Sequence, residues 1–196
     1  MKIHFHAALL ALLVALALLT RATGAEIAVY FSPDGGAAAA VVEEISLAKS
    51  TIKVAAYAIS EPNITRALLA AQERGVFVSI IVTPTQQSDA YSTAGKLKKA
   101  GIPTHVDHEH ALMHNKTMVI DNSVVVTGSM NFTTAGDKKN AENTLIIHDA
   151  AMAALYTANW YSHLEHSGVF KPSHSKDYRP PKPPPHLIIP PRRAHR

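Results

Sequence analysis

Apolar and polar positions alternate with two different spacings along the central part of the chain. Short β-branched or apolar runs, which are typical of strands, occupy residues 27–31, 51–59, 76–82, 117–120, 124–127 and 145–147. Segments with apolar residues three and four positions apart predict helices over 37–48, 61–74, 93–100 and 152–164. Strands that alternate with helices predict an α/β fold, with a mixed, mostly parallel β-sheet and helices on both faces.

The beginning of the chain differs from this central part. Lys2 precedes an apolar run over 7–19, and the small residues Gly24 and Ala25 follow. The run is too short for the roughly 20 residues that cross a bilayer. A charged start, a short apolar middle and a small-residue exit predict a secretory signal peptide over 1–25, with an uncleaved membrane anchor as the alternative. We therefore expect an exported protein, periplasmic or secreted, without stable membrane insertion after cleavage.

The end of the chain is rich in proline and in positive charge. Eight of the twelve prolines follow residue 171, and the segment 171–196 holds seven Lys or Arg but a single Asp. Such a segment is expected to be disordered, extended and solvated, either without a specific role or as a basic arm that contacts phosphates. The formal charge of the whole chain is +4, so the segment 26–170 is acidic. The basic pI belongs to the tail and predicts no nucleic-acid surface on the central domain.

The central segment 26–170 has the size of one domain. The chain contains no cysteine. Its hydrophobic core must therefore provide stability without disulfides.

The residues with the clearest chemical character begin at His114. Side chains two positions apart in a strand share a face, so His114 and Lys116 should point the same way. An imidazole and an ammonium repel one another when both are charged, unless an anion lies between them. A phosphate is such an anion, because Lys provides compact charge and His provides a nucleophile or a proton.

Polar side chains that suit the same chemistry follow downstream. Ser129 and Asn131 offer donors two residues apart, just after a predicted strand. Glu142 precedes the next strand and is placed to accept a hydrogen bond from a histidine nitrogen. Lys138 and Lys139 lie between these segments, where we expect them to contact substrate phosphates.

Together these residues form a pattern that resembles the phospholipase D superfamily. The pattern is His-x-Lys-x4-Asp over 114–121, Gly-Ser-x-Asn over 128–131, and Glu-Asn at 142–143. The resemblance is closest to the small, single-motif bacterial endonucleases and covers nearly the whole domain, including 31–33 and 56–57. The His-Lys pair alone is a weak signal, but the serine, asparagine and glutamate in their places make the pattern specific.

The resemblance implies a phospholipase D-like fold and a role for each residue. His114 would attack phosphorus to form a phosphohistidine, which water then hydrolyses. Lys116 and Asn131 would bind the non-bridging oxygens, with Ser129 as a supporting donor, and Glu142 would orient a histidine. No metal or other cofactor is expected for catalysis, because lysine and amide donors stabilise the charge.

Two further residues of the pattern are expected to have structural rather than catalytic roles. Asp121 lies at an odd offset from His114, which places it on the other face of the strand, as a turn or ion-pair residue. Gly128 permits a close approach of the backbone just after a strand.

A single motif in each chain has a consequence for assembly. In-line displacement at phosphorus needs a nucleophile on one side and an acid near the leaving oxygen on the other. One His114 cannot do both in one step, so we predict a twofold homodimer with a shared active site.

The function that these features favour is a nonspecific endonuclease that cleaves DNA, and RNA as a further substrate. The first alternative is a phospholipase D-type hydrolase that uses the same chemistry on a phospholipid. The apolar segment 111–113 and the basic tail are compatible with such a substrate at a membrane. The second alternative is an inactive nucleic-acid-binding module.

Histidines crowd the segment before His114. They alternate with carboxylates in a way that could bind zinc, and the residues concerned are His105, Asp107, His108, Glu109 and His110. Because His114 belongs to the phosphodiesterase pattern and the others precede the strand, we expect a polar rim or solvated loop and no metal.

Overall fold

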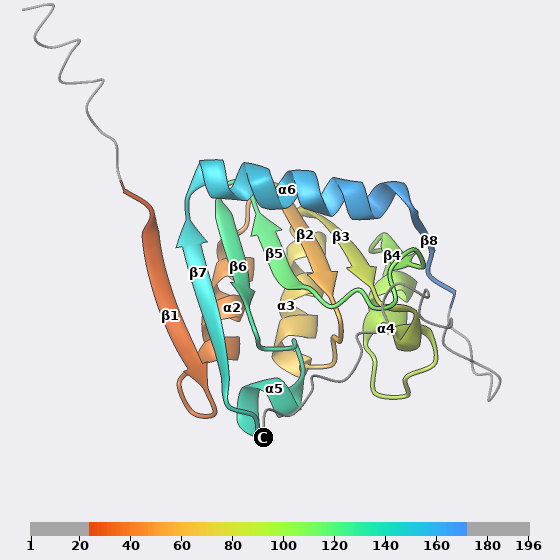
Figure 1. Ribbon diagram of the computed structural model, residues 1–196, viewed down its shortest axis with the longest axis horizontal. Coiled ribbons are helices and arrows are strands. Elements are labelled where there is room, and N and C mark those ends of the chain that lie inside the picture. Colours follow the sequence, from red (N-terminus) through yellow and green to blue (C-terminus); the bar gives the residue numbers. More distant parts are fainter. Residues whose placement is uncertain (1–23, 172–196) are drawn as a thin grey trace, which may run out of the picture.

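An eight-stranded sheet with helices on both faces forms the centre of the protein (Figure 1). The computed structural model describes residues 24–171. Nearly all of the predicted signal peptide (1–25) and of the predicted tail (171–196) lies outside these residues. Between residues 24 and 171, no helix is long and apolar enough to cross a membrane.

The strands lie in the order β1-β7-β6-β5-β2-β3-β4-β8. Their bounds are β1 (Glu26–Ser32), β2 (Thr51–Ala56), β3 (Phe77–Val82), β4 (Thr104–Asp107), β5 (Lys116–Ile120), β6 (Val124–Gly128), β7 (Glu142–His148) and β8 (Ser167–Val169). The pairs β2–β3 and β3–β4 are parallel, and the other five neighbouring pairs are antiparallel. The predicted α/β class is confirmed. The expected majority of parallel pairs is not found, because β5 and β6 form a hairpin and β7 returns antiparallel beside β6.

Helices cover the two faces of the sheet unequally. Their bounds are α2 (Ala37–Leu47), α3 (Pro62–Glu73), the short 3-10 helix η1 (Pro84–Gln87), α4 (Ala94–Lys99), α5 (Thr134–Lys138) and α6 (Ala150–Glu165). The main core lies between the sheet and α2, α3 and α4, and its fully buried side chains include Ile45, Leu68 and Met118. On the other face, α6 crosses the strands (Figure 1). Trp160 of α6 is buried there, and its Nε1 donates to the main-chain oxygen of Val54 at 2.9 Å.

Four strand ends meet at one end of the sheet, which is the lower end in Figure 1. Here β2 ends at Ala56 and β5 begins at Lys116, and these two residues are paired. At the same end, β6 finishes at Gly128 and β7 begins at Glu142. The strand ends therefore bring together residues that are far apart in the sequence.

Asp121 lies at the opposite end of β5, in the turn to β6. Its carboxylate accepts hydrogen bonds from three main-chain nitrogens, those of Lys49 (2.8 Å), Ser50 (2.8 Å) and Thr51 (2.9 Å). Burial alone would raise the pKa of Asp121, but these hydrogen bonds outweigh it and hold the pKa below its usual value. Asp121 thus fastens the β5–β6 turn to the start of β2.

Some elements of the right-hand edge in Figure 1 were not predicted from the sequence. The expected loop around His105 and Asp107 is strand β4, which pairs with both β3 and β8. Both β4 and β8 are too short, at four and three residues, to leave an apolar run in the sequence. In addition, β2 ends at Ala56, before the expected end at residue 59.

Candidate active site

His114 and Lys116 lie together at the lower end of the sheet. Lys116 Nζ is 3.3 Å from His114 Nδ1, and it donates to the main-chain oxygen of His114 at 2.6 Å. The Lys116 side chain is buried, whereas His114 is exposed. Burial lowers the pKa of Lys116, and the negative charge of Glu142 opposes part of that lowering. An accessible imidazole therefore lies beside an ammonium that solvent screens only weakly.

Tyr57 contacts both members of this pair. Its ring centroid is 4.8 Å from that of His114, and Lys116 Nζ lies 5.2 Å from the Tyr57 ring centroid. The main-chain nitrogen of Tyr57 donates to the oxygen of Asn115 at 2.9 Å, which continues the β2–β5 pairing past the end of β2. Tyr57 thus provides one wall of the site and a cation–π contact to the ammonium.

Glu142 is bound by Ser129. Ser129 Oγ donates to Glu142 Oε2 at 2.5 Å, and Asn140 Nδ2 donates to Glu142 Oε1 at 3.0 Å. Ser129 Oγ also accepts from the main-chain nitrogen of Asn143 at 3.1 Å. Among the residues that the structure describes, no hydrogen bond joins Glu142 to His114. The expected contact between Glu142 and a histidine is therefore not formed within one chain.

Gly128 lets β6 approach β7 closely at the site. Its φ is +149°, and a Cβ at this position would lie 2.3 Å from the main-chain oxygen of Asn143. That same oxygen accepts from the main-chain nitrogens of Ser129 (3.0 Å) and Met130 (3.3 Å). Only a residue without a side chain fits here, so Gly128 fixes where the Ser129 hydroxyl lies.

Asn131 has an unusual environment at the same turn. Its Oδ1 is buried and has no hydrogen-bond partner among the described residues. A buried polar atom without a partner is costly, and such atoms are concentrated at functional sites. This unpaired oxygen marks the turn after β6 as a place where the Asn131 side chain is not fixed by hydrogen bonds within the described residues.

The two lysines of the α5 region differ in their surroundings. Lys138 Nζ forms an ion pair with Asp137 at 2.8 Å, and the Asp137 hydrogen bond raises the pKa of Lys138. Asp137 is itself buried, and its Oδ1 accepts from the main-chain nitrogen of Ala38 at 3.2 Å. Lys139 is exposed, and no ion pair involves it among the described residues. Of the two, Lys139 has the ammonium that is more available to a phosphate.

The predicted histidine-rich segment separates into different environments. Asp107 is fully buried at the end of β4, and His110 Nδ1 lies 2.9 Å from its Oδ2. His163 and His166, which were not predicted as site residues, also face Asp107. The side chains gathered here are Asp107, His110, His163 and His166, so neither His105 nor His114 belongs to this cluster. His114 is thus separate from this cluster.

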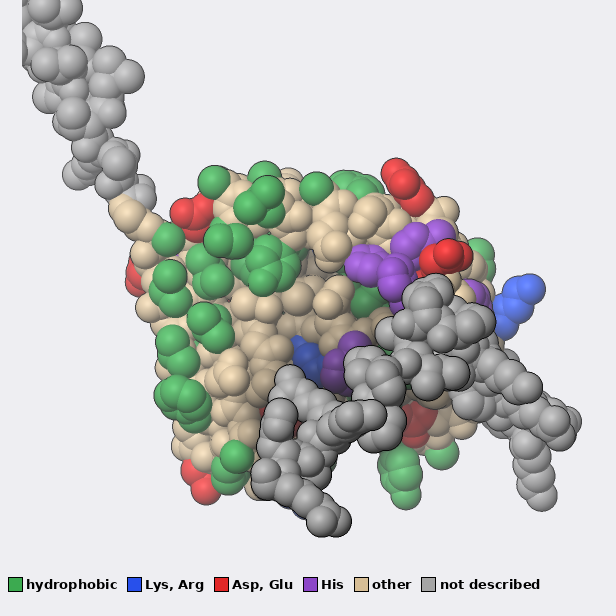
Figure 2. All heavy atoms as spheres, in the orientation of Figure 1, with side chains coloured by type: hydrophobic (Ala, Val, Ile, Leu, Met, Phe, Trp, Pro, Cys, Tyr) green, Lys and Arg blue, Asp and Glu red, His purple; other side chains and the backbone are tan. Residues whose placement is uncertain are grey.

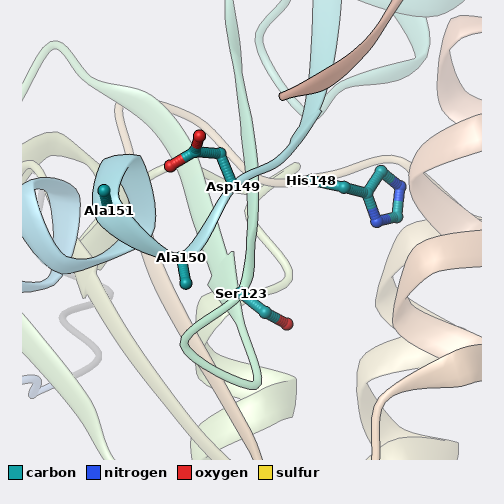
Figure 3. A pocket seen from close by; sticks show the side chains of 5 residues that line it. All are labelled: Ser123, His148, Asp149, Ala150 and Ala151. Atoms are coloured by element: carbon teal, nitrogen blue, oxygen red, sulfur yellow. The ribbon is translucent and has the colours of Figure 1, made fainter. Parts of the chain in front are cut away.

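A cavity of about 350 Å³ lies at the other end of the sheet. It is lined by Ser123, His148, Asp149, Ala150 and Ala151 (Figure 3). Two of the polar side chains here already have partners: His148 Nε2 lies 3.2 Å from Glu44 Oε1, and Asp149 Oδ1 accepts from the main-chain nitrogen of Met152 at 2.7 Å. In Figure 3, His148 points toward α2 and Asp149 lies at the start of α6. We assign no catalytic role to this cavity.

Comparisons with known proteins identify the family. The family model "Cardiolipin synthase, PLD-like domain" matches residues 41–164. A phospholipase D from Rickettsia bellii is 38% identical over 138 residues, which make up 70% of this chain and 69% of that protein. A mitochondrial cardiolipin hydrolase from Mus musculus is 35% identical over 109 residues, covering 56% of this chain and 49% of that protein.

The fold gives the same result. The crystal structure of Nuc from Salmonella typhimurium, a phospholipase D family member, superimposes with a TM-score of 0.72 and 32% identity. The match covers 76% of this chain and 99% of Nuc. The chain therefore belongs to the phospholipase D superfamily, as its sequence pattern predicts. It is a phosphodiesterase of this superfamily, and thus a hydrolase.

Proposed function

We propose that this phosphodiesterase is a metal-independent, nonspecific endonuclease that cleaves DNA, and RNA as a further substrate, through a phosphohistidine on His114. The observation that carries the proposal is the exposed imidazole of His114 beside the buried ammonium of Lys116, with 3.3 Å between the two nitrogens. The match to Nuc, which covers 99% of that protein, supports a small enzyme of the phospholipase D family.

The position of Lys116 sets a condition on the attacking nitrogen. A cationic Lys116 that donates to His114 Nδ1 favours the tautomer with its proton on Nε2, and a protonated nitrogen cannot attack. For Nε2 to attack, Lys116 has to turn toward the phosphate oxygens, and Nδ1–H has to find another acceptor. Glu142 is the carboxylate whose charge acts on Lys116. Within one chain, however, its hydrogen bonds go to Ser129 and Asn140.

A twofold dimer would provide the missing contacts. In it, Glu142 would accept from the Nδ1–H of the partner's His114, and both imidazoles would face one phosphate. His114 Nε2 would form a bond to phosphorus while the bond from phosphorus to the leaving oxygen breaks. The partner's His114 would give that oxygen a proton. Water would then attack phosphorus, the bond to His114 would break, and the proton from water would return to the partner's imidazole.

The proposed reaction develops charge on the non-bridging oxygens. Lys116 would bind one of them through its ammonium, and the Asn131 amide nitrogen would donate to another. Preorganised donors of this kind stabilise a transition state because they need no reorganisation during the reaction. Ser129 would act mainly by holding Glu142.

An apolar surface supports the dimer. Three large hydrophobic side chains of β1 face the α6 side of the sheet and are exposed: Ile27 (55%), Val29 (50%) and Phe31 (63%). Leu155 of α6 is exposed as well. Figure 2 shows apolar side chains over β1 and α6 on this face. Large apolar side chains exposed together on one face are typical of subunit interfaces. We propose that two copies associate through it.

A phospholipid substrate is the second candidate, and one observation favours it. Leu112 lies two residues before His114 and is 47% exposed, so an apolar side chain borders the site. Met113 of the same segment is buried and is not available to a lipid. The relatives named phospholipase D and cardiolipin hydrolase are consistent with this alternative.

One experiment distinguishes these substrates. Plasmid DNA and vesicles of phosphatidylcholine with cardiolipin are offered to the wild type, to H114A and, as a matched control, to H108A, all with EDTA. We expect nicking of DNA by the wild type and by H108A, and none by H114A. Lipid hydrolysis without nicking would support the phospholipase instead. Cleavage by H114A would contradict the mechanism for either substrate.

We also propose that the protein acts outside the cytoplasm, with 1–25 as a cleaved signal peptide and 171–196 as a basic extension of the catalytic domain. The charged, apolar and small-residue order of 1–25 supports export. Cell fractionation followed by mass spectrometry of the mature amino terminus tests it. A cytoplasmic protein that begins at Met1 would contradict it.

A further inference from the structure

We propose that Asp107, His110, His163 and His166 form a structural site for a divalent transition metal of the zinc class, separate from the catalytic residues. The four residues come from the end of β4, the segment that follows it, and the end of α6. One ligand atom from each lies within 4.8 Å of the others. The end of α6 is where histidine side chains gather in Figure 2.

The contacts around the Asp107 carboxylate are already close to those of a metal site. His110 Nδ1 and His163 Nδ1 lie 2.9 Å and 3.0 Å from Asp107 Oδ2, and His166 Nε2 lies 3.3 Å from Oδ1. Around a tetrahedral zinc ion, neighbouring ligand atoms are about 3.4 Å apart. Small rotations of the imidazoles would therefore be enough to admit an ion.

Two features point to a ligand rather than to a simple histidine–carboxylate cluster. Asp107 is fully buried, and three imidazoles direct a ring nitrogen at its two oxygens. In addition, His166 Nε2 is buried, and although it lies 3.3 Å from Asp107 Oδ1, its orientation does not complete a hydrogen bond with that oxygen. A buried nitrogen without a partner is costly, and coordination to a metal would satisfy its lone pair.

The donor set indicates which metal and which role. Three imidazoles and one carboxylate are borderline ligands that suit Zn²⁺, and four protein ligands close a tetrahedral site. A closed site leaves no position for a substrate, so the metal would stabilise the fold. The lack of cysteine in this chain agrees with a need for another cross-link.

The position of the site shows what it would hold together. Asp107 and His163 are 56 residues apart in the sequence. His166 immediately precedes β8, a three-residue edge strand that pairs with β4. His110 lies on the segment that leads from β4 to His114. A bound ion would therefore fix the edge of the sheet and brace the segment that carries the proposed nucleophile.

The test measures metal binding and thermal stability on the full chain. Protein is stripped with a chelator and titrated with Zn²⁺, and with Co²⁺, whose visible absorption reports tetrahedral coordination. We compare the wild type with the H163A/H166A double variant. H105A/H108A is the matched control, because it removes two histidines of the same region that lie outside the cluster. H110A is included because His110 is half exposed and its removal should leave the fold intact.

We expect the wild type and H105A/H108A to bind one Zn²⁺ per chain, with a higher Tm and a tetrahedral Co²⁺ spectrum. H110A should stay folded by circular dichroism but bind more weakly, and H163A/H166A should lose both the metal and the Tm increase. The proposal is overturned if the wild type binds no stoichiometric metal, or if H110A and H163A/H166A bind it as the wild type does.

Discussion

The ammonium of Lys116 lies 3.3 Å from Nδ1 of His114, and the Tyr57 ring contacts both side chains. His114 is exposed and Lys116 is buried, so the imidazole is accessible to a substrate and the positive charge of Lys116 lies beneath it. An incoming phosphate would meet the imidazole first and then draw the ammonium toward its oxygens.

Removal of the Lys116 charge should slow the chemical step. We expect K116M, which keeps the length and apolar stem of the side chain, to lower kcat by roughly 10²–10³-fold, the effect of losing one charged transition-state donor. The measurement is kcat on bis(p-nitrophenyl) phosphate, with circular dichroism to show that the variant is folded. A folded K116M whose kcat stays within twofold of the wild type would remove Lys116 from the mechanism.

The pKa of Lys116 predicts a pH dependence. Phosphate binding needs the ammonium form, and burial lowers the pKa of Lys116, so activity should fall with rising pH before a solvated lysine would titrate. An arginine remains protonated there, so the K116R variant should lose this alkaline limb, whatever its maximal rate. Profiles of kcat/KM against pH for both proteins check this. Identical alkaline limbs would show that another group titrates.

Asp121 should contribute to stability in a pH-dependent way. The pKa of Asp121 is lowered in the folded protein, so its stabilisation is complete above the unfolded-state pKa and is lost as pH falls through the folded-state value. At neutral pH we expect D121N to lower the free energy of unfolding by about 1–3 kcal/mol, the cost of hydrogen bonds to a charged group. The difference from the wild type should shrink in acid.

Urea unfolding at several pH values measures this effect, with E43Q as the control. Glu43 is an exposed carboxylate of α2. A D121N protein as stable as E43Q at neutral pH would refute the structural role of Asp121.

The two lysines of the α5 region should differ in their effect on DNA binding. Each phosphate contact that is lost reduces the slope of log K against log salt by about 0.7–0.9. We expect K139A to show a reduction of this size and K138A a smaller one, because Asp137 already pairs with Lys138. Binding of a DNA oligonucleotide to each variant, over a range of salt concentrations, tests this. Equal slopes in all three proteins would exclude both lysines from the DNA path.

Gly128 should be intolerant of any side chain. A Cβ would lie 2.3 Å from the oxygen of Asn143, so G128A must displace β6 from β7 and with it Ser129. We expect loss of activity and of about 1–3 kcal/mol of stability, the usual cost of such backbone strain. G75A is a useful comparison, because Gly75 also has a positive φ (+90°) but has no atom within 4 Å of an added Cβ. Full activity in G128A would contradict the role of this close approach.

Features that depend on neighbouring residues could be predicted from the sequence, whereas features that depend on pairing between distant segments could not. The strand period correctly placed His114 and Lys116 together, and long apolar runs revealed β3 and the helices α2 and α3. By contrast, β4 and β8 are short strands near one edge of the sheet, and they are defined by their pairing with strands distant in the sequence, β4 with β3 and β8 with β4. Local pattern carries no information about such pairing.

The candidate site shows the same limit. Ser129 and Glu142 were both predicted as site residues, but their mutual hydrogen bond depends on the register of β6 against β7. The segment 56–57 belongs to the family pattern, but the sequence predicts no role for Tyr57, because its contact with His114 requires the β2–β5 pairing to continue past Ala56. His163 lies on α6 and His166 directly follows it; neither was predicted, since only the packing of α6 across the sheet brings them to Asp107.

The proposed mechanism requires that phosphorus becomes bonded to His114 during turnover. The most direct measurement mixes enzyme and DNA, denatures the mixture at neutral or alkaline pH within the first turnover, and locates the adduct by mass spectrometry of the peptides. We expect phosphorus on the peptide that contains His114, in the wild type and in H108A, and no adduct in H114A. An adduct on any other residue, or rapid turnover in which no adduct forms, would contradict it.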